Sequence, residues 1–133
     1  MNTRDLFIIG NRGKTLGTVT EQSSHEERFQ NLTLRPILKL QNDLFLEVFK
    51  NYIDKHKNDF YAFPVDKKLQ FIENAIQKDI KFRNSLKGII IGLFTLDEYA
   101  EYIQNSSNLN KRMMKMLDER LKSNVLLFET PTN

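Results

Sequence analysis

The polar side chain with the most suggestive position in the sequence is Arg83. It falls on the apolar stripe that Ile76 and Leu86 would form on a helix, and Asp79 precedes it by four residues. The simpler interpretation is an Asp79–Arg83 ion pair within one helix, at the edge of the core. In the alternative, Arg83 and Lys87 lie one helical turn apart and face an anionic ligand or a partner carboxylate between helices.

Two residues from an earlier part of the chain, Tyr52 and His56, complete this candidate site. With Arg83, Lys87 and Asp79 they are the residues that we expect to contact a ligand or partner in a pocket between helices. None of them is assigned as catalytic. The paired carboxylates of the chain fall at helix starts or on charged faces, and a Gly-x-Ser-x-Gly signature does not occur.

Metal and nucleotide chemistry find little support. The chain has no cysteine and two histidines, His25 and His56, and neither belongs to a Glu-x-x-His pair of the kind that binds metals in helical bundles. One histidine from each of two subunits would still allow a site across a dimer. The segment GNRGKT from Gly10 to Thr15 resembles a phosphate-binding loop, but two residues separate its glycines where four are needed. We therefore expect no metal and no cofactor, and we favour a protein that is not an enzyme.

The basic residues raise the question of nucleic acid. The chain has 20 Lys and Arg against 17 Asp and Glu, a net charge of +3, and the excess is clearest in residues 61–94. The two signs are mixed along most of the chain, which is typical of a solvated surface. We favour that interpretation and keep RNA or the ribosome as an alternative partner. The candidate basic face consists of Lys67, Lys78 and Lys81, with Arg12 and Lys14 from the N-terminal segment.

The elements that would position these residues are helices. Of the 133 residues 40% are hydrophobic, and five glycines and three prolines are too few for a fold with many tight turns. Length and composition therefore predict one all-α domain, a compact bundle of four main helices and one short helix over residues 24–129. The periodicity places helices at about 24–34, 36–56, 66–94, 95–104 and 109–128.

Helix starts and glycines refine this arrangement. Ser24 and Thr95 each precede a glutamate by three residues, which predicts two capping boxes. Gly88 and Gly92 lie four residues apart in the third predicted helix and suggest a close approach of another helix. Residues 1–23, with three of the five glycines, are expected to form a flexible arm that could become ordered against a partner chain. Residues 130–133 are expected to form a disordered tail.

The apolar segments indicate a location away from membranes. The run of residues 88–94 is seven residues long, far short of a membrane span. The N-terminus lacks the longer apolar region and the cleavage site of a secretory signal. We therefore expect a cytoplasmic protein with no membrane partner.

Three stretches resemble a small bacterial family of uncharacterised helical proteins. They are LRPILKLQND (34–43), IQKDIKFRN (76–84) and YIQNSS (102–107). Members of this family sometimes carry the label "glyoxalase", whereas true glyoxalase I-type enzymes are built from βαβββ modules with a His/Glu metal site. This sequence has neither the strands nor the histidines for that. The resemblance thus implies a helical fold and kinship, and it assigns no activity and no residue.

These observations lead to three hypotheses. The first is a non-enzymatic protein that acts through protein–protein association, either as a homodimer or with another protein. The second is a binder of a small molecule or cofactor, with its pocket near Arg83. The third is an RNA- or ribosome-associated protein, whose binding would weaken steeply with salt.

Overall fold

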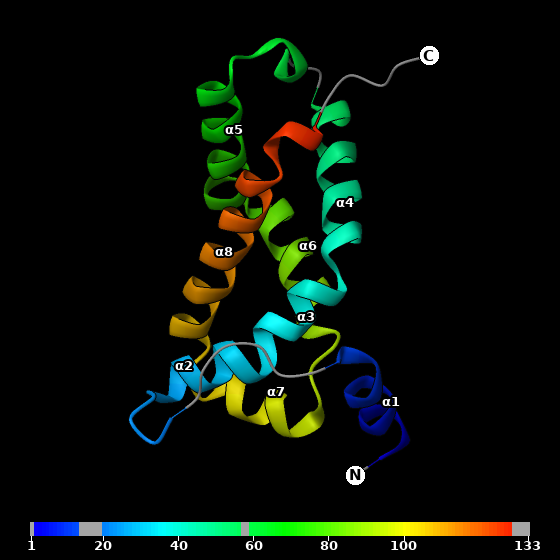
Figure 1. Cartoon of the computed structure of the whole chain (residues 1–133), viewed down its shortest axis with the longest axis vertical. Coiled ribbons are helices and arrows are strands. Elements are labelled where there is room, and N and C mark those ends of the chain that lie inside the picture. The colour runs from blue at the N-terminus through cyan, green and yellow to red at the C-terminus, as the bar shows by residue number, and fades with distance from the viewer. Residues whose placement is uncertain (1, 14–19, 57–58, 129–133) are drawn as a thin grey trace.

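The computed structural model describes residues 2–13, 20–56 and 59–128, and every element in these ranges is helical (Figure 1). The predicted all-α class is therefore confirmed. Within the described ranges, no helix is long and apolar enough to cross a membrane. The elements in chain order are α1 (Thr3–Arg12), α2 (His25–Phe29), the π-helical turn η1 (Gln30–Leu34), α3 (Arg35–Leu40), α4 (Asn42–Lys55), the 3-10 turn η2 (Phe60–Ala62), α5 (Val65–Lys78), α6 (Ile80–Ile91), α7 (Leu96–Ile103), α8 (Ser106–Ser123) and the 3-10 turn η3 (Val125–Leu127).

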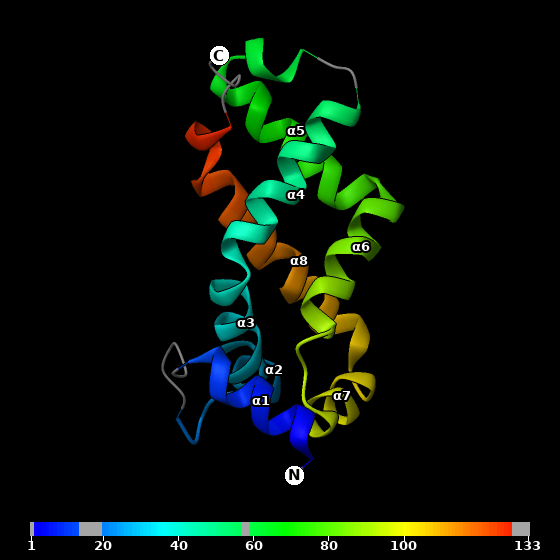
Figure 2. The same cartoon turned by 90° about the vertical axis from the view of Figure 1, so that its right-hand side faces the viewer.

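The molecule is elongated, and its two ends are built differently (Figures 1 and 2). Helices α4, α5, α6 and α8 form one end, where α5, α6 and α8 pack against one another. The shorter helices α1, α2 and α7 form the other end, and α3 connects the two. More helical pieces are therefore present than the predicted four main helices and one short one.

A cluster of aromatic rings fills the end that holds α4. The Phe49 ring, fully buried on α4, lies 5.0 Å from the ring of Phe128 and 6.2 Å from those of Phe71 on α5 and Phe82 on α6, measured between centroids. Phe60 of η2 lies 5.2 Å from Phe71. These edge-to-face and tilted contacts stabilise the packing beyond the burial of apolar area. The ten phenylalanines of the sequence thus serve largely as core.

The single helix predicted over residues 66–94 is wrong, because the chain breaks at Asp79. Its backbone is extended, with φ −88° and ψ 97°, and its carboxylate oxygen Oδ1 accepts a hydrogen bond of 3.1 Å from the Phe82 amide. Asp79 is thus the N-cap of α6, a position that aspartate favours over a helix interior. Helix α6 ends at Ile91, with Gly92 as its C-cap.

Pro36 lies inside a continuous helical path from α2 to α3. Proline has no amide hydrogen, so it leaves the carbonyl of Leu32, four residues earlier, without its usual helical donor. The π-helical turn η1 widens the helix here, and the Arg35 amide bonds to the Gln30 carbonyl five residues back. Arg12 of α1 donates a hydrogen bond to the Leu32 carbonyl, at 3.2 Å. The carbonyl that Pro36 leaves without a helical donor is therefore also the group to which Arg12 attaches α1.

The N-terminal segment differs from the predicted arm. Residues 3–12 form α1, which buries Asp5 and Ile8 against the rest of the protein and ends at Gly13, whose φ is +78°. Gly17, Lys14 and the tail at 130–133 lie outside the described residues.

The expected close approach of a helix at the two later glycines is also wrong. No neighbouring heavy atom lies within 4 Å of where a Cβ would stand at Gly88. At Gly92 the nearest atom is the Gly88 carbonyl oxygen of the same helix, at 3.1 Å. Gly92 instead ends α6.

Candidate functional site

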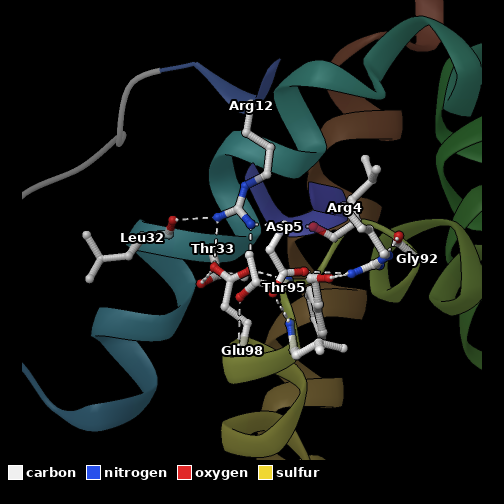
Figure 3. A network of polar contacts seen from close by, with 11 residues as sticks. Arg4, Asp5, Arg12, Leu32, Thr33, Gly92, Thr95 and Glu98 are labelled. Carbon is white, nitrogen blue, oxygen red and sulfur yellow. Dashed lines mark hydrogen bonds and ion pairs between the residues drawn. The ribbon is translucent and has the colours of Figure 1, made fainter. Parts of the chain in front are cut away.

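The contacts of α1 centre on Glu98, near the start of α7 (Figure 3). Its carboxylate accepts hydrogen bonds from Arg12 at 2.5 and 2.8 Å, from the Thr33 hydroxyl at 2.7 Å and from the Thr95 amide at 2.8 Å. The Thr95 hydroxyl in turn accepts from the Glu98 amide, so the predicted capping box is confirmed. The Arg12 and Glu98 side chains are only 7% and 17% exposed. This largely buried ion pair joins α1, η1 and α7.

A second acid–base set holds the first turn of α1. Asp5 is 4% exposed, and it accepts hydrogen bonds from the Leu96 amide at 3.1 Å and from Arg4 at 3.0 Å. Arg4 also donates to the carbonyl oxygens of Phe94 and Gly92, at 2.9 and 3.0 Å. Asp5 thereby satisfies a free amide at the start of α7, and Arg4 satisfies carbonyls at the end of α6. We call the set Arg4, Asp5, Arg12, Thr33, Thr95 and Glu98 the clasp.

The hydrogen bonds of the clasp determine the charge state of Glu98. Burial is the largest single influence on its pKa and acts to raise it. The hydrogen bonds from Arg12, the Thr95 amide and Thr33, together with the positive charge of Arg12, outweigh burial and hold the pKa below its ordinary value of 4.5. Glu98 is therefore negatively charged at neutral pH, the form that accepts the hydrogen bonds of the clasp.

Helix α1 buries Asp5 and leaves apolar side chains exposed. Leu6, Phe7 and Ile9 are 60%, 71% and 46% exposed. Helix α7 lies at the same end of the molecule (Figure 2) and also has exposed apolar residues. We call these residues the outer face: Leu6, Phe7 and Ile9 of α1 with Leu96, Tyr99 and Ile103 of α7.

Three of the five residues predicted to contact a ligand meet at the start of α6. The Tyr52 hydroxyl donates to Asp79 Oδ2 at 2.9 Å, and His56 Nε2 lies 3.7 Å from the same oxygen. Burial, then the hydrogen bond to Asp79, raises the pKa of Tyr52 to about 12. The pKa of Asp79 is lowered, first by the Phe82 amide and then by Tyr52. The tyrosine is thus a neutral donor that braces a helix cap.

Arg83 and Lys87 do not join this cluster. They line a separate groove between α5, α6 and α8. Within the described residues no Asp79–Arg83 ion pair forms, so the simpler interpretation of Arg83 is wrong. The guanidinium instead donates to the Gln77 carbonyl at 3.3 Å. The cause is the break at Asp79, which commits that carboxylate to the cap of α6.

The predicted basic face is not brought together on one surface. Lys78 and Lys81 are exposed on either side of the α5–α6 junction and line one shallow hollow. Lys67 lies at the far end of α5, with its ammonium group 4.9 Å from the centre of the Phe63 ring. Arg12 belongs to the clasp, and Lys14 lies outside the described residues.

Neither metal-ligating groups nor comparisons with known proteins indicate a function for these residues. In the part of the chain that the structure describes, no three His, Asp or Glu side chains are grouped to hold a metal. No protein-family model matches the chain, and comparisons with curated proteins and with solved structures likewise find no match. The resemblance inferred from the sequence stays a prediction.

The clasp and the outer face were not predicted from the sequence. One signal was available in the N-terminal segment, where Asp5, Ile8 and Arg12 follow helical spacing and can share one face of a helix. That assignment turns Leu6 and Phe7 outward, whereas Ile9, four residues after Asp5, lies at the edge of the inward face. The partners of Asp5 and Arg12 are more than 80 residues away in the chain, so no local pattern could identify them.

Proposed function

We propose that the protein is a non-enzymatic association module that forms a homodimer through the outer face. One observation carries this proposal: α1 buries its aspartate and exposes Leu6, Phe7 and Ile9. An amphipathic helix normally packs with its apolar residues inward. In α1 only Ile8 of the four apolar residues is buried, and the other three leave an apolar surface that association would remove from water.

The extent of the outer face supports a second copy as its occupant. An interface of standard size buries about 800 Å² on each partner. The outer face offers six large apolar side chains, each between 46% and 71% exposed, toward such an area. The same patch would meet itself across a two-fold axis, which is the commonest symmetry of homodimers.

The charges around α1 also support association with an uncharged surface. Arg4 and Arg12 are the basic residues of this helix, and both are bound to carboxylates and carbonyls of the same chain. They are therefore already engaged, which argues against a nucleic acid or an anionic membrane as the occupant of this end. We place the dimer in the cytoplasm, where a chain without cysteine loses no disulfide to the reducing conditions.

The molar mass measured over a range of protein concentrations tests the proposal. We expect twice the chain mass of 15.7 kDa at micromolar concentration. Phe7→Lys should raise the dissociation constant about 100-fold, because it places a charge in the centre of an apolar contact. Leu126→Lys is the matched control, because Leu126 is also 71% exposed but belongs to η3, the turn at the end of the molecule opposite α1 (Figure 1). A wild-type protein that stays monomeric, or two variants that dissociate equally, would contradict the proposal.

A further inference from the structure

The groove that contains Arg83 and Lys87 has the dimensions of a ligand site. It lies between α5, α6 and α8 and has a volume of about 750 Å³, within the range that is usual for small-molecule sites. Ile76 of α5 and Met114 of α8 give it an apolar lining. It is separate from the outer face, so an inference about it is independent of the proposed dimer.

Charged residues divide the groove into two parts along α8. At one end, Lys122 is paired with Glu73 at 3.4 Å and with Asp118 at 3.0 Å. Toward the other end lie Lys111 and Lys115 of α8, opposite Arg83 and Lys87 of α6. Among the described residues, these last four cations form no ion pair.

Helix geometry groups the four unpaired cations into two pairs, and both pairs line the same groove. Residues four apart lie about 6 Å apart along a helix axis and on the same side of it. Arg83 and Lys87 therefore present two charges from one wall, and Lys111 and Lys115 present two from the other. Four like charges around one groove repel one another, and a bound anion would relieve that repulsion.

We propose that this groove binds a small phosphorylated metabolite, such as a nucleotide or a sugar phosphate. The phosphate lies among Arg83, Lys87, Lys111 and Lys115, which line the groove. A nucleic-acid strand fits less well, because Glu73, Asp118 and Glu119 would repel its phosphates as it continued along the groove. The ligand is therefore short.

Titration calorimetry at low salt, with ADP and inorganic pyrophosphate as probes, tests this assignment. We expect saturable binding of one probe molecule per chain. The double variant Arg83→Gln/Lys87→Gln should weaken binding at least about tenfold, because each residue donates charged hydrogen bonds to the phosphate. Lys111→Gln/Lys115→Gln, on the other wall, should have a similar effect. These neutral, polar replacements on partly exposed positions keep the fold, which circular dichroism will verify.

A control with the same loss of charge separates a site from general attraction. Lys78→Gln/Lys81→Gln removes two exposed lysines outside the groove and should change the affinity for either probe less than twofold. Equal weakening by the control and the groove variants would overturn the proposal, as would the absence of saturable binding by the wild-type protein. Tighter binding of a short single-stranded RNA than of ADP would also contradict it.

Discussion

The clasp and the groove use the same kinds of side chain in opposite ways. In the clasp, Arg12 and Glu98 share two hydrogen bonds, and each also bonds to another protein group, Arg12 to the Leu32 carbonyl and Glu98 to the Thr33 hydroxyl. In the groove, Arg83 reaches one backbone carbonyl, and Lys87 has no ion-pair partner among the described residues. The clasp is thus complete within one chain.

This difference distinguishes a structural ion pair from a candidate binding site. Removing one partner of a largely buried, hydrogen-bonded ion pair leaves the other charge uncompensated and destabilises the fold. Partly exposed charges without partners contribute little to folding and remain free to bind. The two regions should therefore respond to substitution in opposite ways, the clasp in stability and the groove in affinity.

The largest loss of stability is expected for Arg12→Leu. The substitution leaves the Glu98 carboxylate largely buried without its cationic partner, so the free energy of unfolding should fall by about 3 kcal/mol. Arg35→Leu, at an exposed position of α3, is the control and should change it by less than about 0.5 kcal/mol. Urea denaturation measures both. Equal effects would mean that the clasp is no more than a surface contact.

Glu98→Gln should cost less, about 2 kcal/mol at pH 7, because the amide retains part of the hydrogen bonding without the charge. The pKa of Glu98 is below 4.5 in the folded protein, so its charge contributes stability above that pH. That contribution is lost as the pH falls through the folded-state pKa. The stability difference between wild type and variant should therefore shrink as the pH falls. Denaturation curves recorded from pH 7 to pH 3 test this expectation, and a difference that stays constant over that range would contradict it.

Thr95→Ala tests the capping box within the clasp. The variant loses the side-chain oxygen that accepts from the Glu98 amide at 3.2 Å, and we expect a cost of about 1 kcal/mol. Thr95→Ser keeps that oxygen and should recover most of the loss. Thermal denaturation of the wild-type protein and the two variants ranks their stabilities. Equal destabilisation by the alanine and serine substitutions would contradict this prediction.

The smallest effect on stability belongs to the groove. Arg83→Gln/Lys87→Gln should change the free energy of unfolding by less than about 0.5 kcal/mol, because the two side chains form no ion pair within the described residues. A loss comparable to that of Arg12→Leu would remove the distinction between the two regions. Urea denaturation under the same conditions provides the comparison.

Local patterns in the sequence predicted the helical class and several helix starts. The Ser24 cap forms with a hydrogen bond of 3.1 Å from the Glu27 amide, and the Thr95–Glu98 capping box is complete. Such signals involve residues three apart, so they can be identified without knowledge of the fold. The break at Asp79 was missed because the apolar stripe continues across it, although aspartate is also a common N-cap.

The candidate site was harder to predict because its contacts are distant in the chain. The sequence placed Arg83 and Lys87 with Tyr52, His56 and Asp79, whereas the structure separates them into a groove and a braced helix cap. A continuous helix through Asp79 would have allowed a single site. The division follows from a single backbone conformation, the extended Asp79, which periodicity alone does not reveal.

Chemical crosslinking through one introduced cysteine tests the proposed dimer most directly, because the chain has no cysteine of its own. Gly10→Cys suits this purpose: apart from its own helix backbone, no heavy atom of the described residues lies within 4 Å of where its Cβ would stand, and it lies on exposed α1 one turn from Phe7. With a short bis-maleimide at micromolar protein, we predict a covalent dimer for Gly10→Cys and little for Leu126→Cys. Equal yields from the two variants, or a dimer from Leu126→Cys alone, would contradict association through the outer face.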